Sequence, residues 1–178
     1  MGASGAPVGW AIGIGGDVEL AGDSRVAEQT TSIAHPLTAK HVKEWLSARM
    51  SEGELTYSIR RKSDELFVGV VGLMVKNHAS AEIGYWIGRA FWGSGYATEA
   101  VRRMLVHGFG PLDLQHVEAN VFPDNEASMR VLTKTGFNKA GTSINPAPAR
   151  GGDREVVVYH VTRADFARMV LSAAVGRT

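Results

Sequence analysis

Residues 92–100 have the composition of an anion-binding corner. Gly93 and Gly95 have no Cβ atom, so the backbone can turn sharply and approach a ligand closely. The residues that follow Gly95 favour a helix, and the first N–H groups of a helix lack partners within it. Several such groups at the positive end of a helix dipole suit a phosphate or diphosphate. The alternative is an ordinary turn between a strand and a helix, which the glycines alone do not exclude.

The segments on either side of this corner are a predicted strand and a predicted helix. Residues 81–87 are rich in β-branched and aromatic residues, which is typical of a strand. Downstream, apolar residues recur at helical spacing. A dinucleotide-binding loop would need a third glycine where Thr98 stands, and no Gly-Lys-Ser/Thr follows as in a P-loop. The corner therefore belongs to neither of these nucleotide-binding motifs.

Composition excludes several classes of function. The formal net charge of the 178 residues is +1 and basic runs are short, so we expect no nucleic-acid partner. The chain has no cysteine, which excludes disulfides, thiol nucleophiles and cysteine-ligated metals. The histidines have no metal-binding spacing, so no metal is expected. Because no apolar run reaches about 18 residues, we expect no membrane span and a cytoplasmic protein.

The order of predicted elements defines the expected fold. Residues 1–16 contain six glycines and no charged side chain, and we predict a poorly ordered leader there. A single domain is expected over residues 17–178. It begins with short helices and a helix that follows Thr38, carrying Val42, Trp45, Leu46 and Arg49 on one face. Three strands, a helix, a strand, a helix, two strands and a helix follow. This order predicts an α/β (α+β) fold, with a mixed, mostly antiparallel central sheet and helices on both faces.

The expected boundaries follow from periodicity and turn residues. Strands are predicted at residues 55–61, 65–76, 82–87, 115–122 and 155–161, and helices from Ala97, over 125–135 and from 162 or 165 onward. Residues 66–75 are apolar at almost every position, so this strand should lie in the middle of the sheet.

This order of elements and four segments resemble the GNAT superfamily of acetyl-CoA-dependent N-acetyltransferases. The segments are residues 33–38, 82–87, 92–100, and 125–128 together with 134–137. The branch that the chain is most similar to is the RimJ/RimL group, which acetylates ribosomal-protein N-termini. The resemblance implies acetyl-CoA as co-substrate. It also implies a V-shaped splay between the fourth and fifth strands, where the pantetheine arm inserts.

The resemblance also implies a set of residues that bind coenzyme A. In the wider family Gln or Arg opens the glycine loop, whereas Trp92 stands there in this chain, so backbone amides should hold the phosphates. Backbone N–H groups at a strand bulge near Trp86 or Ile87 could polarise the acetyl carbonyl as an oxyanion hole. The expected contacts are Trp86, Ile87, Gly93, Ser94, Gly95, Tyr96, Ala97, Thr98, Asn120, Asn125 and Ser128.

Two residues are candidates for proton transfer. Glu82 stands in an otherwise apolar strand, and burial raises the pKa of a carboxyl group, so Glu82 is the expected general base. Many family members protonate the leaving thiolate with a tyrosine whose matching position here is Leu132. We therefore expect Ser128 or a water molecule to do so. The alternative for Glu82 is an exposed strand start, and for Asn125 and Ser128 simple helix capping.

The acceptor is an amine whose identity stays open. An α-amine has a reference pKa near 8 and a lysine near 10.4, so a site with one modest base favours an α-amine such as a protein N-terminus. Polyamines, aminoglycosides and amino acids are alternatives, as is a non-catalytic acyl-CoA-binding module. With no cysteine to carry an acetyl group, we expect direct attack in a ternary complex. A homodimer is a further expectation.

Overall fold

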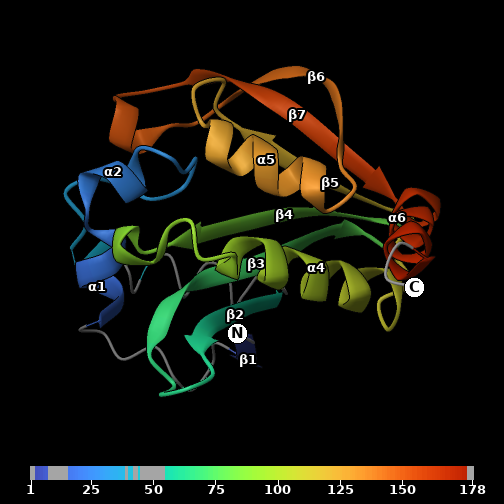
Figure 1. The fold of residues 1–178 in the computed structure, drawn as a ribbon. Helices are drawn as coiled ribbons and strands as arrows, with labels where there is room; N and C mark the ends of the chain where they lie inside the picture. The colour runs from blue at the N-terminus through green and yellow to red at the C-terminus, as the bar shows by residue number, and fades with distance from the viewer. Residues whose placement is uncertain (1–2, 8–15, 39, 42–43, 45–54, 176–178) are drawn as a thin grey trace.

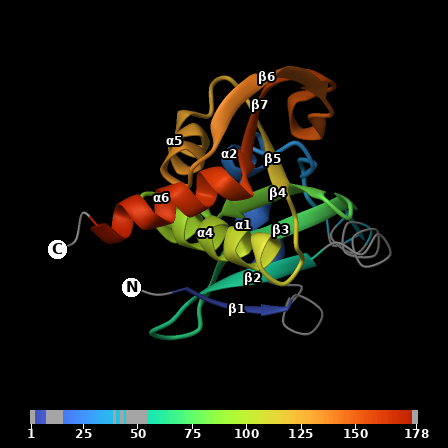
Figure 2. The same ribbon diagram turned by 90° about the vertical axis from the view of Figure 1, so that its right-hand side faces the viewer.

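The computed structural model describes residues 3–7, 16–38, 40–41, 44 and 55–175. Its centre is a seven-stranded sheet in the order β1-β2-β3-β4-β5-β7-β6 (Figures 1 and 2). The strands are β1 Ala3–Pro7, β2 Leu55–Arg61, β3 Phe67–Asn77, β4 Ser80–Ile87, β5 His116–Val121, β6 Asn138–Asn145 and β7 Arg154–Thr162. The β4–β5 pair is parallel and the other pairs are antiparallel, so the predicted mixed, mostly antiparallel sheet is confirmed.

Helices connect and cover the strands. They are α1 Gly16–Ala21, α2 Ser24–Ala27, α4 Tyr96–Phe109, α5 Glu126–Lys134 and α6 Arg163–Val175, with 3₁₀ turns η1 Arg89–Phe91 and η2 Pro148–Arg150. The four residues of the predicted helix face, Val42, Trp45, Leu46 and Arg49, lie outside the described residues. At the predicted start of that helix, the Thr38 hydroxyl oxygen accepts a hydrogen bond from the His41 N–H, as an N-cap does. Among the described residues, no helix is long and apolar enough to cross a membrane.

The prediction for the first residues is wrong in one part. Within the expected leader, Ala3–Pro7 forms β1, which pairs antiparallel with β2 from Ala3/Arg61 to Pro7/Tyr57. A short run without charged or strongly β-forming residues gives no sequence signal for a strand, and the backbone hydrogen bonds of the β2 edge supply the order instead. β1 is therefore the edge strand of the sheet on this side.

The central strand and α4 form the core that positions the site. From Val68 to Leu73 every residue of β3 is buried, as its continuous apolar run predicted. On α4, Val101 and Leu105 are fully buried against the sheet, in one core cluster with Ile83 and Val117. The β3–β4 register runs without interruption from Val75/Ala81 to Gly69/Ile87. This packing fixes β4 as a rigid wall from which site residues project.

Alternate residues of β4 face opposite sides of the sheet. Ile83, Tyr85 and Ile87 contact the core cluster that includes α4. By the two-residue period of a strand, Glu82, Gly84 and Trp86 face the other side. Trp86 packs there against a small cluster of Ala21, Ala27 and Ile33, which belongs to α1, α2 and the segment after them. The side chains of β4 thus contact a different cluster on each face of the sheet.

Candidate active site

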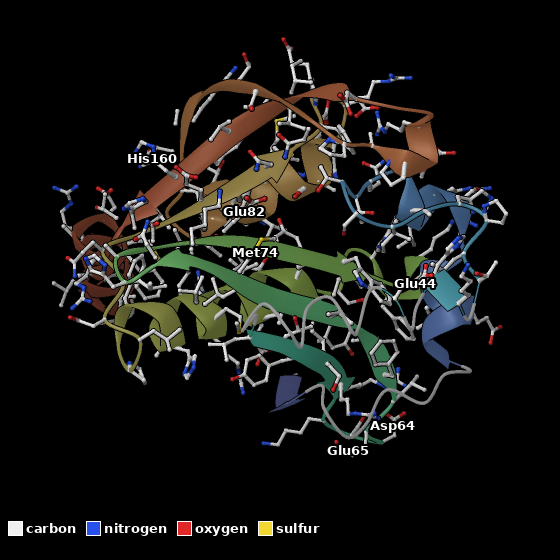
Figure 3. All side chains as sticks on the ribbon, turned by 180° about the vertical axis from the view of Figure 1, so that it is seen from behind. Glu44, Asp64, Glu65, Met74, Glu82 and His160 are labelled. Carbon is white, nitrogen blue, oxygen red and sulfur yellow. The ribbon has the colours of Figure 1, made fainter. Side chains whose placement is uncertain are left out.

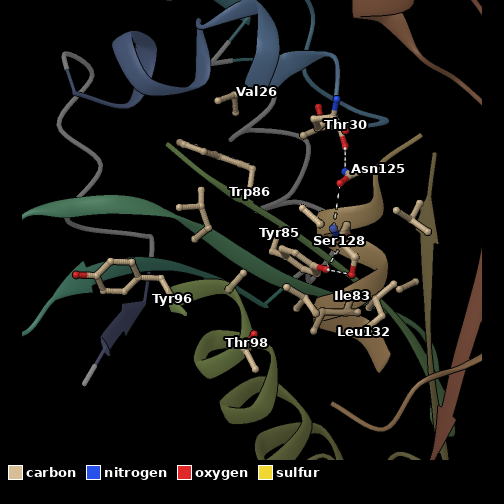
Figure 4. Close-up of a pocket in the computed structure, with 18 of the residues that line it drawn as sticks. Val26, Thr30, Ile83, Tyr85, Trp86, Tyr96, Thr98, Asn125, Ser128 and Leu132 are labelled. Atoms are coloured by element: carbon tan, nitrogen blue, oxygen red, sulfur yellow. Dashed lines mark hydrogen bonds between the residues drawn. The ribbon is translucent and has the colours of Figure 1, made fainter. Parts of the chain in front are cut away.

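A single cavity of about 710 Å³ joins both faces of β4. Its walls come from β4, β5, the α4 N-terminus, α5 and the segment that follows α2 (Figure 4). Every predicted site residue except Ser94 lines it: Glu82, Trp86, Ile87, Gly93, Gly95, Tyr96, Ala97, Thr98, Asn120, Asn125 and Ser128. The fold therefore brings together residues that are separated by up to 46 positions in the sequence, from Glu82 to Ser128.

The gap between β4 and β5 forms the middle of this cavity. The two strands pair at Ser80/His116, Ala81/Val117 and Glu82/Glu118, and beyond these pairs they diverge. The expected V-shaped splay is confirmed. The expected bulge at Trp86 or Ile87 is wrong, because both residues stay in register with β3, opposite Val70 and Gly69. The backbone N–H and C=O groups on this edge of β4 have no strand partner among the described residues because β5 diverges from β4. No bulge in β4 is needed to expose them.

The glycine corner has the geometry of an amide nest at a helix start. Gly93 and Gly95 have φ of +76° and +84°, in the left-handed region that favours glycine. Gly95 is the N-cap of α4 and has no side chain to cap the first turn. The first-turn residues Ala97 and Thr98 line the cavity, so the positive end of this 14-residue helix is directed at it.

Trp92 anchors the corner to β4. Its indole Nε1–H donates a hydrogen bond of 2.7 Å to the Ile87 carbonyl oxygen. The side chain that replaces the Gln or Arg of the wider family therefore points back to the strand, where it fixes the loop. This observation agrees with the expectation that the phosphate ligands here are main-chain groups.

Glu82 is held by two donors at the start of the gap. Its Oε1 accepts a 2.9 Å hydrogen bond from Asn120 Nδ2, and its Oε2 lies 2.9 Å from Lys76 Nζ. The Glu82 side chain is 20% exposed. Figure 3 shows Glu82 on the back of the sheet near Met74, its register partner on β3. Asn120, expected to contact coenzyme A, therefore orients the carboxylate in this structure.

Lys76 connects Glu82 to the surface. Its Nζ also lies 3.5 Å from Glu118 Oε2, and 42% of the Lys76 side chain is exposed. Burial lowers the pKa of Lys76, but the Glu82 and Glu118 carboxylates raise it, and the net shift is upward. Lys76 thus stays charged at neutral pH. The Glu82 carboxylate consequently faces the cavity on one side and a charged, solvent-exposed pair on the other.

Ser128 and Asn125 stand at the start of α5. The Asn125 side-chain oxygen accepts a 3.0 Å hydrogen bond from the Ser128 N–H, so the capping role of Asn125 is observed. Asn125 Nδ2 donates to the Gln29 carbonyl oxygen at 3.5 Å. The Ser128 Oγ lies 2.7 Å from the Tyr85 hydroxyl oxygen (Figure 4). The cap therefore fixes both side chains on the cavity wall between α5 and β4.

Tyr85 lies on the α5 side of the cavity, against Ser128. Burial raises its pKa above the ordinary value, and the hydrogen bond with Ser128 opposes this effect only in part. Tyr85 is therefore a neutral phenol at physiological pH. Leu132, at the position of the usual tyrosine, is 1% exposed and contributes only apolar surface. The Tyr85–Ser128 pair is the hydroxyl pair that this wall offers instead.

A salt bridge lies beside the cavity on the side of α2. Arg150 Nη1 and Nη2 lie 2.9 and 3.0 Å from the two Asp124 carboxylate oxygens, and Arg150 Nε donates to the Glu28 carbonyl oxygen at 2.7 Å. The guanidinium group also lies 4.1 Å above the Phe122 ring centroid. These contacts tie the β6–β7 connection to the segment that lines the cavity at Gln29–Ser32. The Arg150 contact lowers the pKa of Asp124 below its usual value.

Comparison with known families decides the class of the protein. The Acetyltransferase (GNAT) domain family matches residues 16–138. The chain belongs to this family. The corner at residues 92–98, the β4–β5 gap and the α5 cap are thus parts of a GNAT fold.

Among the described residues, no group of three or more His, Asp or Glu side chains is placed to hold a metal ion.

Relatives and solved structures extend the comparison. The chain is 33% identical over 113 residues to the uncharacterized N-acetyltransferase p20 of Bacillus licheniformis, covering 62% of this chain and 64% of p20. It spans less than two thirds of the length of this relative. The fold matches Mycobacterium smegmatis RimJ in complex with CoA-disulfide, with a TM-score of 0.72, 24% identity and coverage of 88% and 81%. It also matches the Vibrio cholerae spermidine N-acetyltransferase in complex with CoA and spermine, with a TM-score of 0.75, 17% identity and coverage of 93% and 98%.

Several residues of this GNAT site carried no usable signal in the sequence. Lys76 stands at the exposed end of an apolar strand, and only the β3–β4 register brings it to Glu82. Tyr85 meets Ser128 across 43 positions of the sequence, so no local pattern points to this contact. Arg150 lies in a Pro/Gly-rich loop and reaches Asp124 across 26 positions. Each contact depends on tertiary packing, which local patterns do not specify.

Proposed function

We propose that this protein transfers the acetyl group of acetyl-CoA to a primary amine, with a protein N-terminal α-amine as the favoured acceptor. The observation that carries the proposal is a single cavity that contains an amide corner, the open gap between β4 and β5, and the Glu82 carboxylate. The family supports this activity, and both named structural neighbours contain coenzyme A or its disulfide. Attack occurs directly in a ternary complex, since the chain has no cysteine to carry the acetyl group.

The diphosphate of acetyl-CoA binds the N–H groups between Gly93 and Thr98. These donors lie at the positive end of α4, and the two glycines leave the approach to the backbone open. The pantetheine arm then follows the gap where β5 leaves β4 after Glu82/Glu118. Backbone N–H groups on this open edge of β4 polarise the acetyl carbonyl. Binding both substrates in one cavity supplies much of the rate through proximity.

Glu82 removes a proton from the acceptor ammonium, and the neutral nitrogen attacks the thioester carbonyl carbon. The carbon–sulfur bond breaks as the tetrahedral intermediate collapses. Ser128 donates its hydroxyl proton to the departing sulfur and takes up the second proton that the nitrogen loses. Tyr85 orients the Ser128 hydroxyl through the 2.7 Å contact. General acid and base catalysis of this kind contributes about 10²- to 10⁴-fold to a rate.

The charges of the cavity favour an acceptor with one amine. The carboxylates among its described lining residues are Glu82, Asp124 and Glu126. They pair with Lys76, Arg150 and Arg130 respectively. Asp124 and Glu126 are already paired with arginines, so they offer little attraction to the additional ammonium groups of a polyamine or aminoglycoside. An α-amine is also easier to deprotonate than a lysine by about 3 kcal/mol.

A panel of acceptors tests the proposal. The full chain is incubated with acetyl-CoA and either peptides with free N-termini, N-blocked lysine peptides, spermidine or an aminoglycoside, and thiol release is followed. We expect the free N-terminal peptides to be acetylated most efficiently. Preference for spermidine or the aminoglycoside would support a small-molecule acetyltransferase instead. Binding of acetyl-CoA without transfer to any amine would support the non-catalytic module that the Leu132 position permits.

A further inference from the structure

Gly84 occupies the middle of the cavity-facing side of β4. It lies between Glu82 and Trp86 on the same face of the strand, and all three line the cavity. The residue opposite Gly84 on β3 is Gly72, which lines the cavity as well. Neither strand therefore places a side chain at this position, between the carboxylate and the indole.

The usual reasons for a glycine inside a strand do not apply to Gly84. Its φ lies outside the left-handed region, and the pairs Leu73/Ile83, Gly72/Gly84 and Val71/Tyr85 continue without a bulge. No atom of the described residues lies within 4 Å of a Cβ built on Gly84. A Cβ on Gly69, by contrast, would lie 2.2 Å from the Trp86 carbonyl oxygen. Close packing thus explains Gly69 but not Gly84.

The remaining reason is the approach of a ligand. A glycine within a strand weakens it and often marks a place where a ligand comes close to the backbone. Gly84 is exposed, and the space above it opens into the cavity. Strand geometry places Glu82 and Trp86 about 7 Å away on either side. This space admits a carbon chain whose amine reaches toward Glu82.

We propose that Gly84 is a specificity-determining residue, over which the amine-bearing carbon of the acceptor lies. This inference rests on the proposed function. The acceptor nitrogen then lies on the Glu82 side, and the substituent of the amine-bearing carbon lies toward Trp86. The absence of a side chain at position 84 sets the upper limit for that substituent. The acceptor class is a primary amine whose neighbouring carbon carries a substituent of limited size.

The variants Gly84→Ala and Gly84→Val test this inference with two peptides that differ only in a first residue of glycine or leucine. We expect Gly84→Val to lower kcat/KM for the leucine peptide about 100-fold and for the glycine peptide less, because added methyl groups fill the acceptor space. Gly84→Ala should lower kcat/KM for the leucine peptide about 10-fold. If Gly84→Val does not fold, the result for Gly84→Ala tests the inference. The Kd of acetyl-CoA should change less than twofold.

Gly141→Val is the matched control. Gly141 is an exposed strand glycine on β6 with open space around its Cβ position, and it does not line the cavity. Equal efficiency of Gly84→Val and wild type with both peptides would overturn the inference. A parallel loss of acetyl-CoA affinity would also overturn it, because Gly84 would then lie on the cofactor path. If the wild-type chain binds acetyl-CoA but acetylates no amine, the proposed function fails and the inference with it.

Discussion

The Tyr85 hydroxyl oxygen lies 2.7 Å from the Ser128 hydroxyl oxygen, so β4 and α5 are joined by a hydrogen bond on the wall of the cavity. The Tyr85 hydroxyl also lies within 3.4 Å of the Ser128 carbonyl oxygen. Because burial keeps the phenol neutral, it can donate to Ser128 Oγ and leave the serine proton directed into the cavity. The pair shares the cavity wall with Leu132, the position at which the family resemblance led us to expect a tyrosine.

Ser128→Ala should lower kcat about 10- to 100-fold, because the leaving thiolate loses its proton donor. Tyr85→Phe should lower kcat by a smaller factor, since Ser128 remains but loses its orientation. Both variants should bind acetyl-CoA nearly as tightly as the wild type, as titration calorimetry would measure. The loss should shrink when the acetyl donor carries a more acidic thiol. An unchanged kcat for Ser128→Ala would assign proton donation to water.

Glu82→Gln should lower turnover at neutral pH about 100-fold, because the amide cannot accept the amine proton. Acetyl-CoA affinity should stay within a factor of two. The control is Glu118→Gln, because Glu118 also lies close to Lys76 but does not line the cavity. Initial rates measured between pH 6 and 9 distinguish the variants. If both variants lose activity equally, the Lys76 pair rather than the Glu82 base is responsible.

Gly95→Ala should weaken acetyl-CoA binding about tenfold, because a φ of +84° strains any residue with a Cβ and displaces the amides of the corner. No described atom lies close enough to clash with the new methyl group, so the effect should come from the backbone alone. Gly151→Ala is a matched control, with φ of +73°, the same open space and a position that does not line the cavity.

Both glycine variants should lose a similar amount of stability, about 1–2 kcal/mol in free energy of unfolding. Only Gly95→Ala should lose affinity. Denaturant unfolding and calorimetry on the same samples separate the two effects. A loss of affinity in Gly151→Ala of equal size would show that general destabilisation explains the result.

The Asp124–Arg150 salt bridge predicts a pH dependence of stability. The pKa of Asp124 is lowered in the folded protein, so its contribution is present above the unfolded value of about 3.9 and lost as pH falls through the lower folded value. Asp124→Asn should therefore lower Tm at pH 7, and the difference from wild type should disappear in strong acid. A constant Tm difference across this range would contradict the assignment.

The sequence predicted well the elements with a strong hydrophobic pattern. It missed elements that form only through pairing with a strand distant in the sequence. The strand at residues 55–61 was predicted with the bounds of β2, and β3 was placed at the centre because its run is apolar on both faces. β1 was missed because only its pairing with β2 orders it. The glycine corner was recognisable because glycine spacing before a helix is a local signal.

The sequence motifs led to residues that share one cavity, but not to the contacts between their side chains. Glu82, Asn125 and Ser128 were proposed from residue type and motif, and all three line the cavity, while their roles stay predictions. The contacts of Lys76 with Glu82 and of Tyr85 with Ser128 were not proposed, because strand register and helix docking bring these side chains together. The predicted bulge at Trp86 failed because strand divergence opens the same edge of β4.

The claim on which the account most depends is that main-chain amides at the start of α4 hold the diphosphate of coenzyme A. Titration calorimetry of the full chain with coenzyme A and with pantetheine, which lacks the diphosphate and the nucleoside, tests it directly. We expect coenzyme A to bind at least about 100-fold more tightly, equivalent to about 2.7 kcal/mol. Equal affinities for the two ligands, or no heat with coenzyme A at millimolar concentration, would contradict the account.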